Sequence, residues 1–155
     1  MKHVLSVLLT LAVGAASAPA MERLDALSQI ESRNNDRAIG TQREVSRFQI
    51  LPAYWVQAKA WKIATDDQSP TDPASAREVV SWIMQGRCRT FAARYHHAPT
   101  DFEYYILWHR PACYIGRPVP RRITSIEADR AHRFVALCDL PDQPVVVASN
   151  TGLGH

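Results

Sequence analysis

The chain contains little glycine and cysteine, and several motifs that depend on them are missing. Six glycines and three cysteines occur in 155 residues. There is no C-x-x-C unit of the kind that holds zinc, no H-E-x-x-H pattern and no glycine-rich loop that could cradle a phosphate. The G-x-S-x-G turn of serine hydrolases is also missing. These absences remove support for zinc, phosphate-transfer and serine-hydrolase chemistry, and we expect no metal or other cofactor.

Long apolar runs are scarce as well, and the longest one lies at the N-terminus. Val4 to Gly14 is almost wholly apolar, follows Lys2 and precedes Ala18-Pro19-Ala20. This order is typical of a bacterial secretory signal peptide over residues 1–20, with an A-x-A cleavage site at its end. The run is shorter than the roughly 20 residues of a membrane span, although an uncleaved anchor is the alternative. We therefore expect a periplasmic or secreted protein without stable membrane insertion.

No excess of one charge dominates the remainder of the chain. The 18 basic residues face 15 acidic ones, and loss of Lys2 with the leader leaves 17 against 15, a net charge of about +2. The clustered basic stripe of a nucleic-acid-binding protein is missing, whereas a mildly basic surface is compatible with an anionic polymer. The length predicts one domain over residues 21–140, followed by a short tail over 141–155. We expect the protein to be a monomer.

The cysteines leave two arrangements open. In an oxidising compartment, two of Cys88, Cys113 and Cys138 could form a disulfide and leave the third free. Three buried free thiols are the other possibility, and the spacing does not choose between them.

The apolar spacing predicts a mainly helical domain. Two helix starts carry capping signals, Asp72 before Pro73 and Thr100 three residues before Glu103. Residues 37–51 alternate apolar and polar side chains around a short polar loop, which predicts a small β-hairpin. The expected fold class is therefore α+β, with helices at 21–33, 53–61, 73–95, 101–109 and 122–137.

The most specific stretch joins the end of the first expected helix to the start of the second. Glu31-Ser32 ends the helix, Asn35 and Ala38 follow, and Gln49-Ile50-Leu51-Pro52 ends the expected hairpin. This order and spacing resemble the lysozyme-like superfamily over residues 24–61, in particular soluble lytic transglycosylases and goose-type lysozymes. The resemblance implies a lysozyme-like fold with a cleft between hairpin and helical body. It also implies cleavage of peptidoglycan between N-acetylmuramic acid and N-acetylglucosamine.

In this resemblance Glu31 is the catalytic acid. A glycosidic oxygen is a poor leaving group and needs a proton, so the carboxyl group must be shielded enough to remain protonated near neutral pH. Glu31 lies beside Leu27 and Ile30 near a helix C-terminus, where negative charge is disfavoured. The resulting carboxylate could take a proton from a sugar hydroxyl or from water, and the sequence does not choose between transglycosylase and hydrolase. A solvated helix-end carboxylate is the alternative.

Glu44 is the candidate for a second carboxylate. A two-carboxylate glycosidase needs an acidic group facing the first one across the substrate, and Glu44 lies on the expected hairpin. It could position water or stabilise positive charge on the sugar. An exposed carboxylate that pairs with Arg43 or Arg47 is an equal alternative.

Five further residues are candidates for substrate binding. The resemblance implies that Ser46 and Gln49 line the cleft, although ordinary strand polarity would explain both. Tyr105 and Trp108 could stack on sugar rings or pack in the core. His109 stands where the family usually has Asn, and its charge varies with pH.

The sequence thus predicts an enzyme, a peptidoglycan-cleaving glycosidase whose partner is the glycan strand. A catalytically impaired glycan-binding or scaffold protein of the cell envelope is the alternative, and His109 favours it. An exported enzyme on another polysaccharide, such as chitin or chitosan, is a further alternative.

Overall fold

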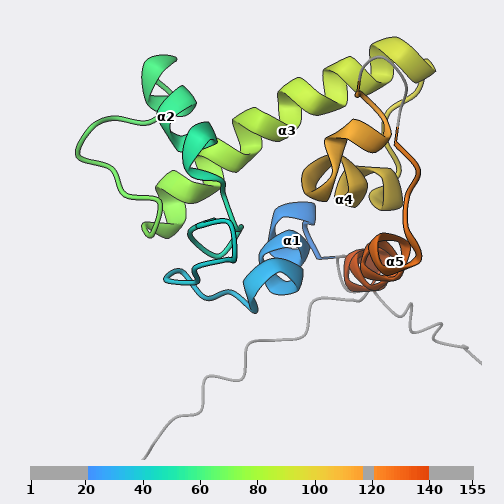
Figure 1. Cartoon of the computed structure of the whole chain (residues 1–155), viewed down its shortest axis with the longest axis horizontal. Helices are drawn as coiled ribbons and strands as arrows, with labels where there is room; N and C mark the ends of the chain where they lie inside the picture. The colour runs from blue at the N-terminus through green and yellow to red at the C-terminus, as the bar shows by residue number, and fades with distance from the viewer. Residues whose placement is uncertain (1–20, 117–120, 140–155) are drawn as a thin grey trace, which may run out of the picture.

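The computed structural model describes residues 21–116 and 121–139, so the expected signal peptide and C-terminal tail lie outside the described residues. Figure 1 shows α3 crossing the molecule, with α1, α4 and α5 grouped on one side of it. Within the described residues the elements are α1 (Arg23–Ser32), α2 (Pro52–Ala60), α3 (Pro73–Tyr95), α4 (Asp101–His109), a short 3-10 helix η1 (Pro111–Cys113) and α5 (Ser125–Asp139).

All five predicted helices are confirmed, with ends that shift by up to three residues. The Asp72 carboxylate accepts a hydrogen bond from the Ser75 backbone N–H at 2.8 Å and caps α3. Thr100 and Glu103 form the expected capping box at the start of α4, each side chain binding the other residue's backbone N–H. Because such caps satisfy the free N–H groups of the first turn, both helices begin where the sequence predicts.

The segment between α1 and α2 differs from the predicted hairpin. Within the described residues no strand forms, and only isolated bridges join Ile39 to Val45 and Val45 to Ile50. Arg43, Ser46 and Gln49 have φ values of 63°, 75° and 56°, in the left-handed region. Each such residue turns the chain, so two extended strands cannot run side by side. The described chain is therefore mainly helical, and the β component of the predicted α+β class is not formed.

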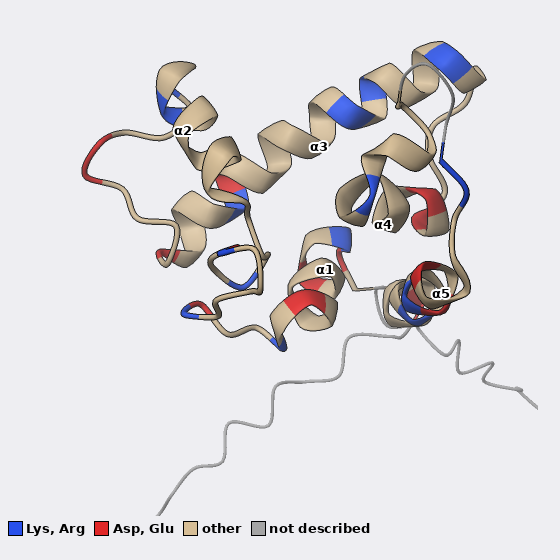
Figure 2. Cartoon of the chain, in the orientation of Figure 1, with Lys and Arg blue, Asp and Glu red and all other residues tan. Residues whose placement is uncertain are grey.

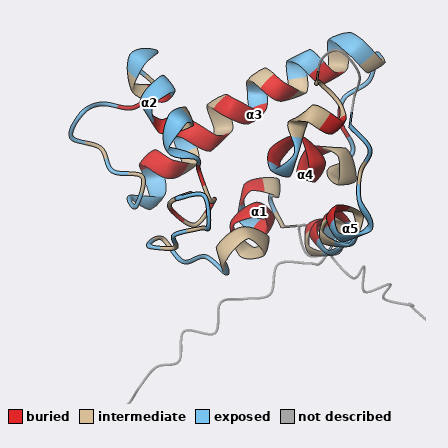
Figure 3. Cartoon of the chain, in the orientation of Figure 1, coloured by how far each residue is buried: buried red, intermediate tan, exposed pale blue. Residues whose placement is uncertain are grey.

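The core is built around α4, which is buried on nearly all sides. Tyr104 to Trp108 are five consecutive buried residues, and α4 packs against α3, α5 and η1. Figure 3 shows buried residues on the facing sides of α1, α3 and α4. A helix that is apolar all round must be enclosed by other elements, so α4 fixes the arrangement of its neighbours. Among the largest fully buried side chains outside α4 are Leu27, Phe48, Ile50, Phe91 and Phe134.

The three cysteines carry free thiols. Cys113 and Cys138 are buried and Cys88 is half-buried, so of the two arrangements left open the structure has the one without a disulfide.

In the described part of the chain, none of the helices has the length and apolar character needed to cross a membrane. Acidic and basic residues lie interleaved on α1 and α5 (Figure 2).

Candidate active site

Glu31 occupies the last turn of α1, at the point where the chain leaves the helix. Arg33 caps α1 in the left-handed conformation, with φ 57°. The Glu31 side chain is only 7% exposed. A carboxyl group buried to this extent needs polar partners, since an isolated buried charge is costly.

Two later helices supply those partners. The Tyr105 hydroxyl of α4 donates a hydrogen bond to Glu31 Oε1 at 3.1 Å. Arg130 Nη2 of α5 lies 3.5 Å from Oε2, and His109 Nδ1 lies 3.9 Å from Oε1. The partners stand 74 to 99 residues away in the sequence, so only the packing of α4 and α5 on α1 assembles the site.

Burial is the largest influence on the Glu31 carboxyl and raises its pKa above the usual value for glutamate. The Arg130 guanidinium and the Tyr105 hydrogen bond act in the opposite direction, and the charge of Glu44 adds to the rise. Burial, assisted by Arg130, lowers the pKa of His109. The imidazole near Glu31 is therefore a neutral neighbour in neutral solution rather than a second cation.

Glu31 lies in the wall of an open cleft of about 740 Å³. This size falls within the range of ligand pockets. Five of the seven predicted site residues line the cleft, namely Glu31, Glu44, Gln49, Trp108 and His109. The cleft thus combines an acidic group with raised pKa, a second carboxylate, an amide and an aromatic side chain.

Gly40 lies very close to the two predicted site residues that the loop places in the cleft, Glu44 and Gln49. A methyl group at Gly40 would lie 2.5 Å from Gln49 Oε1 and would collide with the Glu44 carboxylate. Glu44 Oε2 also accepts a hydrogen bond from the Gln42 backbone N–H at 2.7 Å. Only glycine leaves room for both side chains over this turn.

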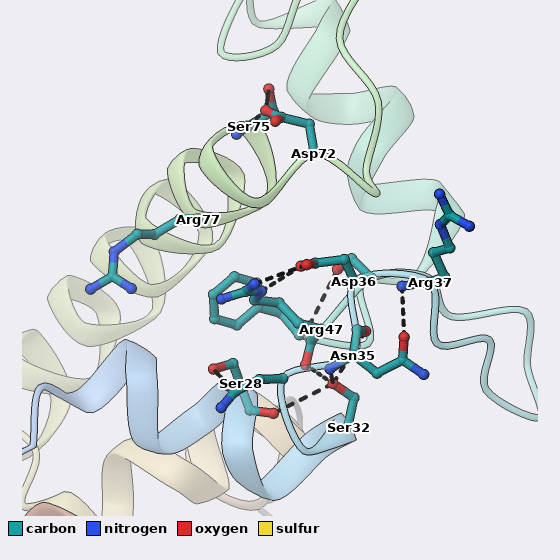
Figure 4. A network of polar contacts seen from close by, with 12 residues as sticks. Ser28, Ser32, Asn35, Asp36, Arg37, Arg47, Asp72, Ser75 and Arg77 are labelled. Carbon is teal, nitrogen blue, oxygen red and sulfur yellow. Dashed lines mark hydrogen bonds and ion pairs between the residues drawn. The ribbon is translucent and has the colours of Figure 1, made fainter. Parts of the chain in front are cut away.

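A polar network fastens the same loop to the end of α1 (Figure 4). The Ser32 hydroxyl donates to the Arg47 carbonyl at 2.9 Å and accepts from the Asn35 backbone N–H at 3.0 Å. The Arg47 guanidinium binds both carboxylate oxygens of Asp36, at 2.5 and 2.9 Å. Arg47 therefore pairs with Asp36, and Glu44 is left facing the cleft.

Two of the predicted substrate contacts do not line the cleft. Ser46 is fully buried, and its hydroxyl accepts a hydrogen bond from the Phe48 backbone N–H at 3.3 Å. Tyr105 is also fully buried, with its ring stacked on His109 and packed against Phe134. Tyr105 reaches the site only through its hydroxyl on Glu31, so it cannot offer a flat face to a sugar.

The structure adds two arginines that sequence reasoning missed. Arg130 gives no local signal, because α5 carries several charged residues and only tertiary packing selects one of them. Arg87 is buried, donates to the Leu107 and Trp108 carbonyls at 2.8 Å, and lies 5.4 Å from the centre of the Trp108 ring. Arg87 lies on the same apolar stripe of α3 as Val80 and Ile83. A charged residue on such a stripe is a signal in the sequence that could have marked Arg87 as a candidate site residue.

Within the described residues, no group of three or more His, Cys, Asp or Glu side chains could hold a metal ion. None of the family models matches the chain, and neither the curated proteins nor the solved structures contain a match. The function is therefore inferred from the residues and their geometry.

Proposed function

We propose that this chain is an exported glycosidase of lysozyme-like fold that cleaves peptidoglycan strands between N-acetylmuramic acid and N-acetylglucosamine. The observation that carries the proposal is the environment of Glu31. Its carboxyl group is 7% exposed, yet it lies in the wall of a cleft of about 740 Å³. Burial raises its pKa, as an acid that must hold a proton near neutral pH requires. The substrate itself comes from the resemblance of residues 24–61.

The proposed reaction begins with proton transfer from neutral Glu31 to the glycosidic oxygen as the C–O bond breaks. The sugar that loses this oxygen becomes positively charged, and Glu31 becomes a carboxylate. The Glu31 carboxylate then removes a proton from one of two groups. If the group is a hydroxyl of the positively charged N-acetylmuramic acid, the oxygen of that hydroxyl closes an anhydro ring. If the group is water, the water oxygen completes hydrolysis. The Tyr105 hydroxyl, 3.1 Å from Oε1, fixes the direction of the carboxyl group through both steps.

Glu44 supports the same chemistry from the loop. It lines the cleft, and its charge contributes to the raised pKa of Glu31. In the proposed mechanism its carboxylate stabilises the positive charge on the sugar. Gln49, which lines the same cleft, is the proposed contact for the polar substituents of the sugar. Trp108 also lines the cleft but is only 8% exposed, so it shapes the wall more than it stacks on a sugar ring.

The test is muropeptide release from purified sacculi by wild type and Glu31→Gln. We expect Glu31→Gln to lower the rate by roughly 10²–10⁴-fold, the usual contribution of a general acid. Glu78→Gln is the matched control, because Glu78 is an exposed glutamate on α3 and its loss should leave the rate unchanged. Equal release by Glu31→Gln and wild type would contradict the proposal. The masses of the products separate anhydro ends from reducing ends, and so transglycosylase from hydrolase.

One observation favours the alternative of a glycan-binding protein without turnover. The Arg130 guanidinium lies 3.5 Å from Glu31 Oε2, where it stabilises the ionised form of the proposed acid. Cosedimentation of the wild-type protein with sacculi, combined with no muropeptide release at any pH, would select this alternative.

A further inference from the structure

A second groove lies beside the cleft, between α2 and α3. Its volume is about 390 Å³, large enough for a small ligand. Gln57 of α2, Trp61 directly after α2, and Trp82 of α3 lie along its sides. Gly86 lies in the groove with open space in front of it, since a methyl group there would meet no atom within 4 Å.

The tryptophans give this groove a character that core packing does not explain. Trp61 is 68% exposed and Trp82 is half-buried. An exposed large aromatic side chain with no partner is unusual unless it contacts a ligand or another surface. One face of a pyranose ring presents C–H groups, which pack well against a flat aromatic ring.

The rim of the groove is polar. Gln57, Arg89 and Thr90 line it, and all three are exposed. Their amide, guanidinium and hydroxyl groups can bind sugar hydroxyl and acetamido groups. Because these hydrogen-bonding groups stand beside two tryptophans and next to the proposed glycan cleft, we take a carbohydrate as the occupant of the groove.

The groove lies next to the Glu31 cleft and shares part of its wall. Tyr54 and Arg87 line both spaces. The Arg87 guanidinium donates to the Tyr54 hydroxyl at 2.7 Å and lies 5.0 Å from the centre of the Tyr54 ring. A buried arginine held in this way fixes the position of Tyr54, and the groove is the next hollow that a polymer extending from the cleft past Tyr54 would meet.

We propose that the groove between α2 and α3 is a second glycan-binding site, which holds the same polysaccharide strand beyond the cleft with Trp61 and Trp82 as stacking surfaces. This inference rests on the proposed function, because the strand in the cleft is what extends into the groove. Substrates long enough to occupy both spaces are bound more tightly than short ones.

The test measures binding of an N-acetylglucosamine hexasaccharide by calorimetry in the Glu31→Gln background, where turnover is suppressed. Trp61→Ala should weaken binding about tenfold, the loss expected for one aromatic contact. Trp61→Phe keeps a flat ring and should retain most of the affinity. Val56→Ala is the control, because Val56 is 67% exposed on α2, the helix that Trp61 follows, but does not line the groove.

Gly86→Leu tests the groove without removing a tryptophan. Its side chain would fill the open space, and a non-glycine residue is favoured inside a helix, so the protein should remain folded. We expect the same loss of hexasaccharide affinity as in Trp61→Ala. Unchanged affinity in both variants would overturn the inference. A change of oligomeric state in place of a change in affinity would overturn it as well, because the groove would then join two copies of the chain.

The two proposals can fail separately. If wild type releases muropeptides while Trp61→Ala and Gly86→Leu keep full affinity, the second binding site is wrong and the proposed reaction stands. If wild type releases none but hexasaccharide binding depends on Trp61, the reaction is wrong and the groove still binds glycan.

Discussion

Arg130 should control the pH range over which the proposed acid works. Its guanidinium lies 3.5 Å from Glu31 Oε2, and its charge lowers the pKa of a carboxyl group that burial raises. Tyr105, His109 and Glu44 are the other polar groups that act on Glu31. Replacing Arg130 by Gln removes a positive charge and keeps a polar side chain. The pKa of Glu31 should therefore rise further.

The size of the effect follows from the separation of the charges. Two unit charges 3.5 Å apart interact by about 1 kcal/mol at the dielectric constant of water and by about 5 kcal/mol at a dielectric constant of about 20. The Arg130 side chain is 28% exposed, so solvent screening brings the value toward the lower end. An interaction of about 1–2 kcal/mol corresponds to a displacement of about one pH unit.

The assay is the pH dependence of muropeptide release. Because the reaction needs protonated Glu31, activity falls as pH rises through its pKa, and Arg130→Gln should move this alkaline limb upward by about one pH unit. Arg133→Gln is the control, since Arg133 lies on the same helix and pairs with Asp129. If the alkaline limb stays in place in Arg130→Gln, or moves equally in both variants, Arg130 does not set the pKa of Glu31. Carbon NMR titration of the Glu31 carboxyl group gives the same comparison without relying on activity.

Two further predictions concern stability and the loop. Since burial raises the pKa of Glu31 in the folded state, wild type loses stability as pH rises through that pKa, and Glu31→Gln should melt a few degrees higher at pH 8. The difference should vanish below about pH 4, where the carboxyl group is protonated in both states, and calorimetric melting curves at both pH values would show it. Gly40→Ala should displace the flexible ends of Glu44 and Gln49 rather than unfold the chain, with a stability loss under about 1 kcal/mol. Muropeptide release should nevertheless fall by roughly 10–10²-fold, and a normal rate with unchanged melting would show that these side chains do not position the substrate.

The helices were predictable because their signals are local. Asp72 and Thr100 with Glu103 mark two helix starts within a few residues, and the structure uses both. The segment over residues 37–51 was not predictable in the same way. Its alternating pattern is typical of strands, but left-handed residues at Arg43 and Ser46 and contacts to the end of α1 turn the chain repeatedly. Tertiary contacts outweigh β-propensity in short segments.

The helical framework, the missing cofactor motifs and the choice of Glu31 as the acidic residue to examine all follow from the amino-acid sequence. These depend on residues close together in the chain. The folding of distant segments against one another brings Tyr105 and Arg130 to Glu31, buries Ser46 and places Tyr54 in the lining of both the cleft and the groove. Burial and electrostatic contact are properties of residues brought together from distant positions, and no local pattern records which of several similar side chains will meet.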